Sequence, residues 1–195
     1  MRNHSDMIRK SKFLSKVMRH EPSIIGVLPD KNGWIDVDLL LDRCNHYGIE
    51  LDLKTLKYIV ESNDKKRFAF SKDQTKIRAS QGHSIKVDLE LKPLTPPEYL
   101  YHGTAKHFLK SIFRDGLLPG KREYVHLTRD IKAASLVGKR HGKLILLRVL
   151  AEEMHHEGYF FYRSENNVWL TATVPARFIK QIEQELDGVH LSTNP

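Results

Sequence analysis

Five short groups of arginine, lysine and histidine residues stand beside turn-forming residues in this sequence, and they are its best candidates for chemistry. A guanidinium group matches the oxygens of a phosphate with two parallel hydrogen bonds. A glycine next to histidine and serine can present backbone N–H groups and a hydroxyl to the same kind of anion. The five groups are Arg19-His20-Glu21-Pro22, Lys65-Lys66-Arg67-Phe68, Gln81-Gly82-His83-Ser84, Tyr101-His102-Gly103-Thr104 and Gly138-Lys139-Arg140-His141-Gly142.

Each group also has a purely structural explanation. Pro22 disfavours helix at Glu21, so Arg19 and His20 end a helix, where cations suit the helix dipole. The group at 65–68 can be a solvated basic turn, and the group at 138–142 a charged helix end. The stretch 81–84 can be a plain loop, whereas 101–104 lies at a predicted strand end, where a phosphate or ribose could approach the backbone.

Several other chemistries find no support in the sequence. It contains no GxxxxGK[ST] loop, no GxGxxG after a strand, no HExxH and no GxSxG. His155 and His156 are adjacent, so on a helix they point about 100° apart and favour a solvated face over a metal site. Cys44 is the one cysteine, which excludes an internal disulfide and a cysteine-based zinc site. It lies in an apolar helical stripe, which is typical of core packing.

The charge of the chain is concentrated in blocks. The 195 residues carry a formal net charge of +8. Residues 1–20, 65–92 and 93–150 are net basic, whereas 21–64 and 151–195 are net acidic. Basic blocks favour a nucleic-acid partner, although many soluble proteins are mildly basic. No apolar run is long enough for a membrane span, and no secretory signal begins the chain, so we expect a cytoplasmic protein with no membrane partner.

The elements that must position these groups fall into two halves. Three prolines within residues 93–97 predict a linker at 93–98. Before it, apolar periodicity predicts helices at 8–20, at 37–47 and after Asp52, with Asp36 and Asp52 as N-caps, then a hairpin at 67–71 and 76–79. This order resembles a winged helix. After it, we expect strands at 99–102, 124–127, 143–150, 159–162 and 168–172 with helices at 105–114 and 130–140, an α+β arrangement.

The order and spacing of several blocks resemble the RNA 2′-phosphotransferase family of the KptA type. The similarity runs from Ser11 to about Phe178. The matching blocks are Ser11-Lys12-Phe13-Leu14-Ser15, Arg19-His20-x-Pro22, Gly33-Trp34-Ile35-Asp36-Val37, Asn63-Asp64-Lys65-Lys66-Arg67-Phe68, Ile77-Arg78-Ala79-x-Gln81-Gly82-His83-Ser84, Tyr101-His102-Gly103-Thr104, Val125-His126-Leu127, Val137-Gly138-x-Arg140-His141-Gly142 and Asn167-Val168-Trp169-Leu170-Thr171.

The resemblance implies a fold and a reaction. It implies a winged-helix RNA-binding lobe at 1–92, the linker, and an ADP-ribosyltransferase-like NAD-binding lobe at 99–195. The activity would be NAD-dependent removal of an internal 2′-phosphate from RNA, of the kind left at a tRNA splice junction. The reaction passes through an ADP-ribosylated 2′-phospho-RNA and yields 2′-OH RNA, nicotinamide and ADP-ribose 1″,2″-cyclic phosphate. NAD is a co-substrate, and no metal is needed. We expect a monomer.

The resemblance also assigns residues to roles. The catalytic set would be Arg19, His20, Arg67 and Arg140, meeting in a cleft between the lobes. The RNA phosphate would be bound by Gln81, Gly82, His83 and Ser84. Residues for NAD would be Tyr101, His102, Gly103, Thr104, Arg122, His126 and Val168. Val168 stands where protein-modifying relatives have a glutamate, which would repel an anionic acceptor, although Glu165 and Asn166 lie nearby and leave the exact alignment open.

Two competing hypotheses remain at this point. One is a nucleic-acid phosphate ADP-ribosyltransferase that stops after the first step. The other is a non-catalytic winged-helix nucleic-acid-binding protein with a degenerate NAD lobe, against which the blocks at 102–104 and His126 argue.

Overall fold

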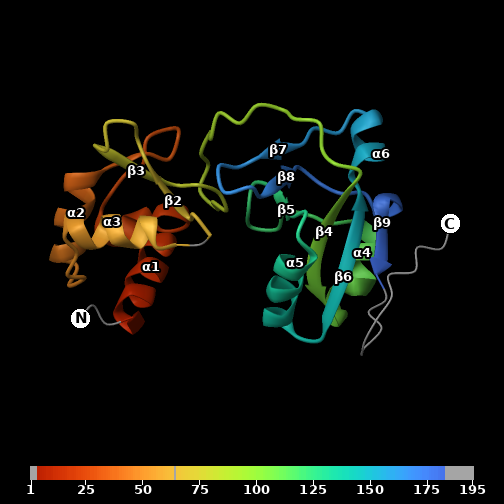
Figure 1. Cartoon of the computed structure of the whole chain (residues 1–195), viewed down its shortest axis with the longest axis horizontal. Helices are drawn as coiled ribbons and strands as arrows, with labels where there is room; N and C mark the ends of the chain where they lie inside the picture. The colour runs from red at the N-terminus through yellow and green to blue at the C-terminus, as the bar shows by residue number, and fades with distance from the viewer. Residues whose placement is uncertain (1–3, 64, 183–195) are drawn as a thin grey trace. The chain divides into compact units, whose positions relative to one another are not determined.

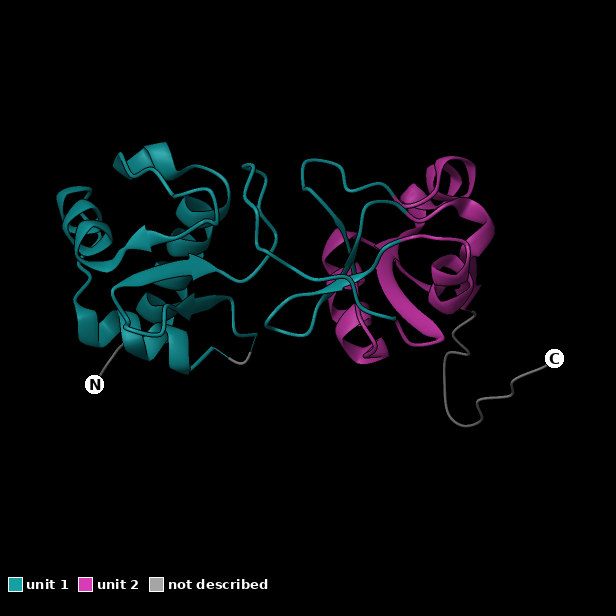
Figure 2. Cartoon of the chain, turned by 90° about the horizontal axis from the view of Figure 1, so that it is seen from above, with its two compact units in different colours: residues 1–95, 118–126, 160–173 teal, residues 96–117, 127–159, 174–195 magenta. Residues whose placement is uncertain are grey.

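The computed structural model describes residues 4–63 and 65–182, and within it the chain forms two compact units. Unit 1 consists of residues 1–95, 118–126 and 160–173, and unit 2 of residues 96–117, 127–159 and 174–195 (Figure 2). The chain first leaves unit 1 at residue 95, inside the proline-rich segment 93–98. It returns to unit 1 twice, so two segments of the second half belong with the first.

The N-terminal part of unit 1 contains three α-helices and a small antiparallel sheet (Figure 1). The sheet has the order β1-β3-β2, and Ile77 of β3 pairs with Ile35 of β1. This confirms the three predicted helices and the hairpin, while the winged-helix assignment stays a prediction. The elements are α1 (His4–Arg19), the 3-10 helix η1 (Pro22–Ile25), β1 (Ile35–Asp36), α2 (Val37–His46), α3 (Leu53–Glu61), β2 (Phe68–Phe70) and β3 (Lys76–Ala79).

The local signals of these elements explain where they begin. The carboxylate of Asp36 accepts a hydrogen bond from Leu39 N at 2.9 Å, and that of Asp52 accepts one from Thr55 N at 2.6 Å. Both predicted N-caps are therefore confirmed. The helices pack their apolar faces into one core with the sheet, and Cys44 is fully buried there, where burial raises the pKa of its thiol to about 11. The prediction of a core cysteine is confirmed.

The remainder of unit 1 is built on a second sheet of three strands. Its strands are β5 (Val125–Leu127), β7 (Tyr162–Arg163) and β8 (Trp169–Thr171), in the order β5-β8-β7, and β5 ends where the chain passes into unit 2. An extended segment without regular secondary structure, residues 80–95, connects the first sheet to the proline-rich stretch. Leu94 N at its end donates to Phe161 O at 2.8 Å.

Unit 2 centres on a third antiparallel sheet, in the order β4-β6-β9, with α5 lying alongside β4 and β6 (Figure 1). The predicted helix at 105–114 is a 3-10 turn followed by a short helix, and that at 130–140 likewise ends in a 3-10 turn. The elements are β4 (Tyr99–Ala105), η2 (Lys106–Phe108), α4 (Leu109–Asp115), α5 (Ile131–Gly138), η3 (Lys139–His141), β6 (Leu144–Leu150), α6 (Ala151–His156), η4 (Ala176–Phe178) and β9 (Ile179–Ile182).

The predicted bounds of two strands were wrong. Residues 159–161 of the strand predicted at 159–162 are not in a strand, because β7 begins at Tyr162, and the strand predicted at 99–102 is longer than expected. We expected the strand to end at His102, but β4 continues to Ala105, and Gly103 pairs with Leu146 of β6. A Cβ atom on Gly103 would lie 1.8 Å from the carbonyl oxygen of Ala134 in α5. The glycine thus allows the helix and the strand to approach closely, and this explains why a glycine stands at position 103 although the chain makes no turn there. Within the described ranges, no helix has the length and apolar character needed to cross a membrane.

Candidate anion-binding site

The first functional pair stands at the end of α1. Backbone N–H groups of His20 and Glu21 both donate to Lys16 O at 3.0 Å, and Pro22 starts the next turn, so the helix ends at Arg19, one residue before the predicted end. Arg19 is half-buried, and its Nη2 donates to the backbone oxygen of Arg67 at 3.3 Å. Its Nε atom is buried and has no hydrogen-bond partner among the described residues.

Like charges surround Arg19. Burial is the main reason why the pKa of its guanidinium falls to about 10, and the positive charges of Arg67 and Arg122 lower it further. A guanidinium with a pKa of about 10 is still fully charged at neutral pH. Three cationic side chains therefore act on one another at the end of α1, and this is a field that attracts an anion.

The segment at 81–84 folds back onto this helix end. Ser84 N donates to Arg19 O at 2.9 Å, and the Ser84 hydroxyl lies 2.9 Å from His20 Nδ1. Gly82 has φ +86, and a Cβ atom there would lie 3.7 Å from Arg19 Nη1, so the guanidinium packs on the bare backbone. The structure therefore brings Ser84 and Gly82 to the Arg19–His20 pair.

His83 is held in an unusual environment. Its side chain is 3% exposed, and burial, followed by the charges of Arg19, His20 and Arg78, lowers its pKa to about 4. The imidazole is therefore neutral at pH 7. Its Nε2 atom and the Oε1 atom of Gln81 are buried without a hydrogen-bond partner in the described part of the chain. Such atoms are costly to bury, so a polar ligand would satisfy them.

A further arginine, Arg122, acts on the same site from the second segment of unit 1, residues 118–126. Nη1 of Arg122 lies 3.1 Å from Nδ1 of His126, and the Arg122 charge lowers the pKa values of both Arg19 and His20. The pKa of His20 falls mainly because of burial. We define the cationic cluster as the arginines Arg19, Arg67 and Arg122 together with the neighbouring imidazoles of His20 and His83.

Not every predicted site residue lies in unit 1. Tyr101 to Thr104 are interior residues of β4 in unit 2, where Tyr101 and His102 are partly exposed and Thr104 is buried. Arg140 is an exposed residue of η3 in the same unit. Val168 belongs to unit 1 and is half-buried, and its N–H donates to the Ser164 hydroxyl at 3.1 Å. The meeting of Arg19, Arg67 and Arg140 in a cleft stays a prediction.

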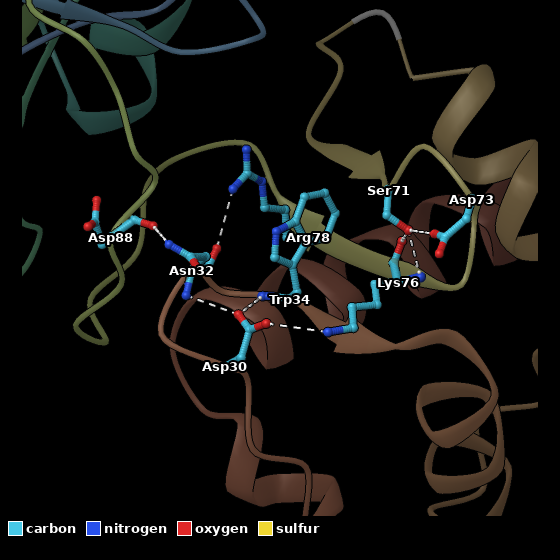
Figure 3. Close-up of polar contacts among 8 residues, drawn as sticks. All are labelled: Asp30, Asn32, Trp34, Ser71, Asp73, Lys76, Arg78 and Asp88. Carbon is cyan, nitrogen blue, oxygen red and sulfur yellow. Dashed lines mark hydrogen bonds and ion pairs between the residues drawn. The ribbon is translucent and has the colours of Figure 1, made fainter.

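Sequence reasoning missed Arg78, whose positive charge acts on His83. Its guanidinium carbon lies 4.4 Å from the ring centroid of Trp34, and its Nη2 pairs with Glu165 at 2.8 Å. Figure 3 shows this arginine over the indole, with its weak contact to the backbone oxygen of Asn32 at 3.5 Å. Arg78 lies between the buried residues Ile77 and Ala79 on β3, and that alternation is the signal that a side chain of the hairpin faces elsewhere.

A second missed residue fixes the segment that carries Arg67. Asn166 Nδ2 donates to the backbone oxygen of Lys65 at 2.9 Å, and its Oδ1 accepts from the Ser164 hydroxyl at 2.7 Å. Together with the Arg78–Glu165 pair, this contact attaches the β7–β8 hairpin to the basic hairpin of the first sheet, both within unit 1. Glu165 is therefore engaged as an ion-pair partner.

These observations define a class of protein: a two-unit α/β chain whose first unit gathers arginine and histidine side chains suited to a phosphate-like anion. No group of three or more histidine, cysteine, aspartate or glutamate residues suited to a metal ion occurs in the part of the chain described.

Comparison with known proteins gives the family. Residues 5–173 match the family model described as RNA 2′-phosphotransferase, Tpt1 / KptA family. A protein of Flavobacterium johnsoniae named a probable RNA 2′-phosphotransferase is 52% identical over 170 residues, covering 87% of this chain and 93% of that protein. One of Hahella chejuensis with the same name is 47% identical over 179 residues, with 92% and 96% covered. The chain belongs to the RNA 2′-phosphotransferase family, as the sequence blocks predicted.

Proposed function

We propose that the chain removes a 2′-phosphate from RNA and transfers it to NAD, releasing 2′-OH RNA, nicotinamide and ADP-ribose 1″,2″-cyclic phosphate. Family membership supports the substrate. The observation that carries the proposal is the half-buried guanidinium of Arg19, on which only cationic neighbours have a resolved effect among the described residues. An incoming phosphate dianion supplies the missing negative charge, and the family gives that dianion its source in RNA.

The arginines grip the phosphate in this proposal. The Arg19 side chain is held by the backbone oxygen of Arg67 and by the surface of Gly82, so little freedom remains to be lost when it binds. Its buried Nε atom is one unsatisfied donor available to a phosphate oxygen. Guanidinium groups fixed in this way stabilise charge that builds up on phosphoryl oxygens during transfer.

His20 supplies a proton donor or acceptor beside the phosphate. Its lowered pKa keeps most of the imidazole neutral at pH 7, and its Nδ1 is already engaged by the Ser84 hydroxyl. The Nε2 atom is left for the ligand. A bound dianion raises the pKa of this ring, which brings its charge change closer to neutral pH.

Arg122 joins the phosphate-binding set in this proposal, beyond the NAD role that the family resemblance implies for it. The support is electrostatic, because Arg122 acts on both Arg19 and His20. Arg140 keeps its proposed role in charge stabilisation, and comparing Arg122→Ala with Arg140→Ala separates the two. Loss of phosphate affinity in Arg122→Ala alone supports the reassignment, and loss in Arg140→Ala alone rules it out.

NAD is the proposed acceptor, and it supplies the ribose carbon to which the phosphate is transferred. The partly exposed rings of His102 on β4 and His126 on β5 have the polar character needed to hydrogen-bond ribose hydroxyls. Thr104 is buried, so we assign its side chain to packing of the strand rather than to ligand binding.

The direct test is to incubate the protein with NAD and a short RNA carrying one internal 2′-phosphate and to resolve the products. Dephosphorylated RNA together with the cyclic phosphate supports the proposal. Accumulation of ADP-ribosylated RNA supports a transferase that stops early, and RNA that is bound but unchanged supports a binding protein. Arg19→Lys, which keeps the charge but loses the planar fork, should lower kcat by about 100-fold. Arg9→Lys, on the exposed face of the same helix, is the matched control.

A further inference from the structure

A cavity of about 460 Å³ lies in unit 1 next to the cationic cluster. A narrower hollow adjoins it, and the two share Leu89, Glu123 and Tyr124 as lining residues. The narrow hollow is also lined by Gln81, Gly82, His83 and His126. The larger cavity is lined by Lys31, Lys86, Val87, Asp88, Leu89, Leu91, Glu123, Tyr124 and Tyr162. It therefore lies beside the proposed phosphate site, in a region for which the proposed function gives no role.

Two tyrosine rings form an aromatic corner of this cavity. The ring centroids of Tyr124 and Tyr162 are 5.6 Å apart, and the rings are inclined by 59°. Both side chains are half-buried, and both line the cavity. A flat ligand can stack on one ring while its edge meets the other, the geometry that aromatic groups prefer. The corner therefore favours a planar ring system.

The polar lining is balanced in charge and is partly fixed in place. Two lysines, Lys31 and Lys86, and two carboxylates, Asp88 and Glu123, line the cavity. The backbone at 88 is tied to the neighbouring loop, because Asp88 N donates to Lys31 O at 2.8 Å and Asn32 Nδ2 donates to Asp88 O at 2.7 Å (Figure 3). Carboxylates accept hydrogen bonds from exocyclic amines, and lysines donate to ring nitrogens and carbonyl groups.

The size of the cavity fits the same ligand. Small-molecule sites usually measure roughly 300 to 1,000 Å³, and a cavity of about 460 Å³ accommodates one nucleoside. A planar wall, paired donors and acceptors, and an adjacent cationic cluster together describe a site for a nucleotide rather than for an isolated ion.

We propose that this cavity binds the base of the RNA nucleotide whose 2′-phosphate occupies the cationic cluster. The inference rests on the proposed function, since it takes the phosphate to be that of RNA. Adenine, guanine and cytosine carry an exocyclic amine that can donate a hydrogen bond to the carboxylate of Asp88 or Glu123, whereas uracil carries no such amine. The cavity consequently prefers the three amine-bearing bases to uracil.

The test measures binding without turnover, by calorimetric titration with each of the four nucleoside 2′-monophosphates. Inorganic phosphate and ADP-ribose are the comparison probes. Tyr124→Leu and Tyr162→Leu should each weaken the binding of adenosine 2′-monophosphate by about 5- to 150-fold, the range for loss of one base stack. Inorganic phosphate should bind these variants as tightly as the wild type. Tyr124→Phe, which keeps the ring, should restore most of the nucleotide affinity.

A matched control comes from another hollow of unit 1, which is lined by Tyr58 and Arg67 among others. Tyr58→Leu removes one tyrosine ring there and should leave nucleotide binding unchanged. If Tyr58→Leu weakens binding and Tyr124→Leu does not, the base lies in that other hollow and the proposal is wrong.

Three further results would overturn the proposal. The wild type could bind none of the nucleoside 2′-monophosphates at millimolar concentration. Tyr124→Leu could weaken the binding of inorganic phosphate as much as the binding of the nucleotides, which would show that the ring only shapes the cluster. The variants could weaken the binding of ADP-ribose alone, which would assign the cavity to NAD. Failure of the proposed function is distinguishable, because it would appear as nucleotide binding that depends on Tyr124 without removal of the phosphate.

Discussion

The buried imidazole of His83 makes the stability of unit 1 sensitive to mild acid. Its pKa of about 4 in the folded protein lies below the usual value of 6.5 that it takes in the unfolded chain, and burial is the main cause. The unfolded chain therefore binds a proton more readily than the folded one between these two values. The stability is fully present above pH 6.5 and is lost as the pH falls towards 4.

The size of the effect follows from that shift. One pKa unit corresponds to about 1.4 kcal/mol, so the fall from 6.5 to about 4 corresponds to roughly 3.5 kcal/mol when complete. Between pH 7 and pH 5, where only part of the shift is realised, linkage gives a loss of about 2 kcal/mol from His83 alone. His20 also has a lowered pKa, so it contributes in the same direction.

The measurement is urea unfolding at pH 7 and pH 5, for the wild type and for His83→Gln, which cannot titrate. Both tryptophans, Trp34 and Trp169, belong to unit 1, so their fluorescence reports on that unit. The free energy of unfolding should fall by about 2 kcal/mol less in the variant than in the wild type, because His20 and the carboxylates are common to both.

Two results would refute this reasoning. The wild type and His83→Gln could lose the same free energy between the two pH values. Alternatively, a nuclear magnetic resonance titration could place the His83 pKa near 6.5, which would show that the ring is not desolvated. Saturating inorganic phosphate is a useful additional condition, since an anion in the cluster should raise the His83 pKa and weaken the acid sensitivity.

Three other changes test the local geometry. Arg122→Gln removes a positive charge that acts on His20, so the His20 pKa should rise in a nuclear magnetic resonance titration. An unchanged pKa would show that the charge of Arg122 does not act on His20. Gly103→Ala should destabilise unit 2 by about 3 kcal/mol or more, because its Cβ would collide with a backbone carbonyl. The Cβ of Gly120→Ala meets no atom, so this control variant should lower the free energy of unfolding by only about 1 kcal/mol, for its positive φ. Thermal unfolding compares the two variants. Asp36→Ala should lose about 1 kcal/mol in urea unfolding, and Asp36→Asn, which keeps a capping oxygen, should lose much less.

The helical half of the fold was predictable because its signals are local. Asp36 and Asp52 cap their helices through their own following residues, and apolar spacing predicts the buried faces. The extent of β4 was not predictable in the same way. Gly103 reads as a turn residue from sequence, but pairing with β6 and the approach of α5 hold it in a strand. Strand β9 was missed, and it is defined by its pairing with the edge of β6.

The site shows the same division between local and distant causes. The end of α1 at Arg19 is a local consequence of Pro22. The hydrogen bond between Ser84 N and Arg19 O joins residues far apart in sequence, so only the resemblance to a family indicated that these segments work together. Arg78 and Asn166 were missed because their partners, Glu165 and Lys65, lie far away along the chain. No spacing rule connects such pairs.

The cationic cluster combines like charges that repel one another, so other contacts must offset the repulsion. The end of α1 contributes the negative pole of the helix, and the backbone oxygen of Arg67 accepts from Arg19. Arg78, which also acts on His83, is neutralised by Glu165 and stacked on Trp34. The helix end and the backbone oxygen of Arg67 offset the charges of Arg19, Arg67 and Arg122 only in part. If a dianion binds there as proposed, relief of repulsion contributes part of its affinity, and we expect phosphate affinity to fall steeply with salt concentration.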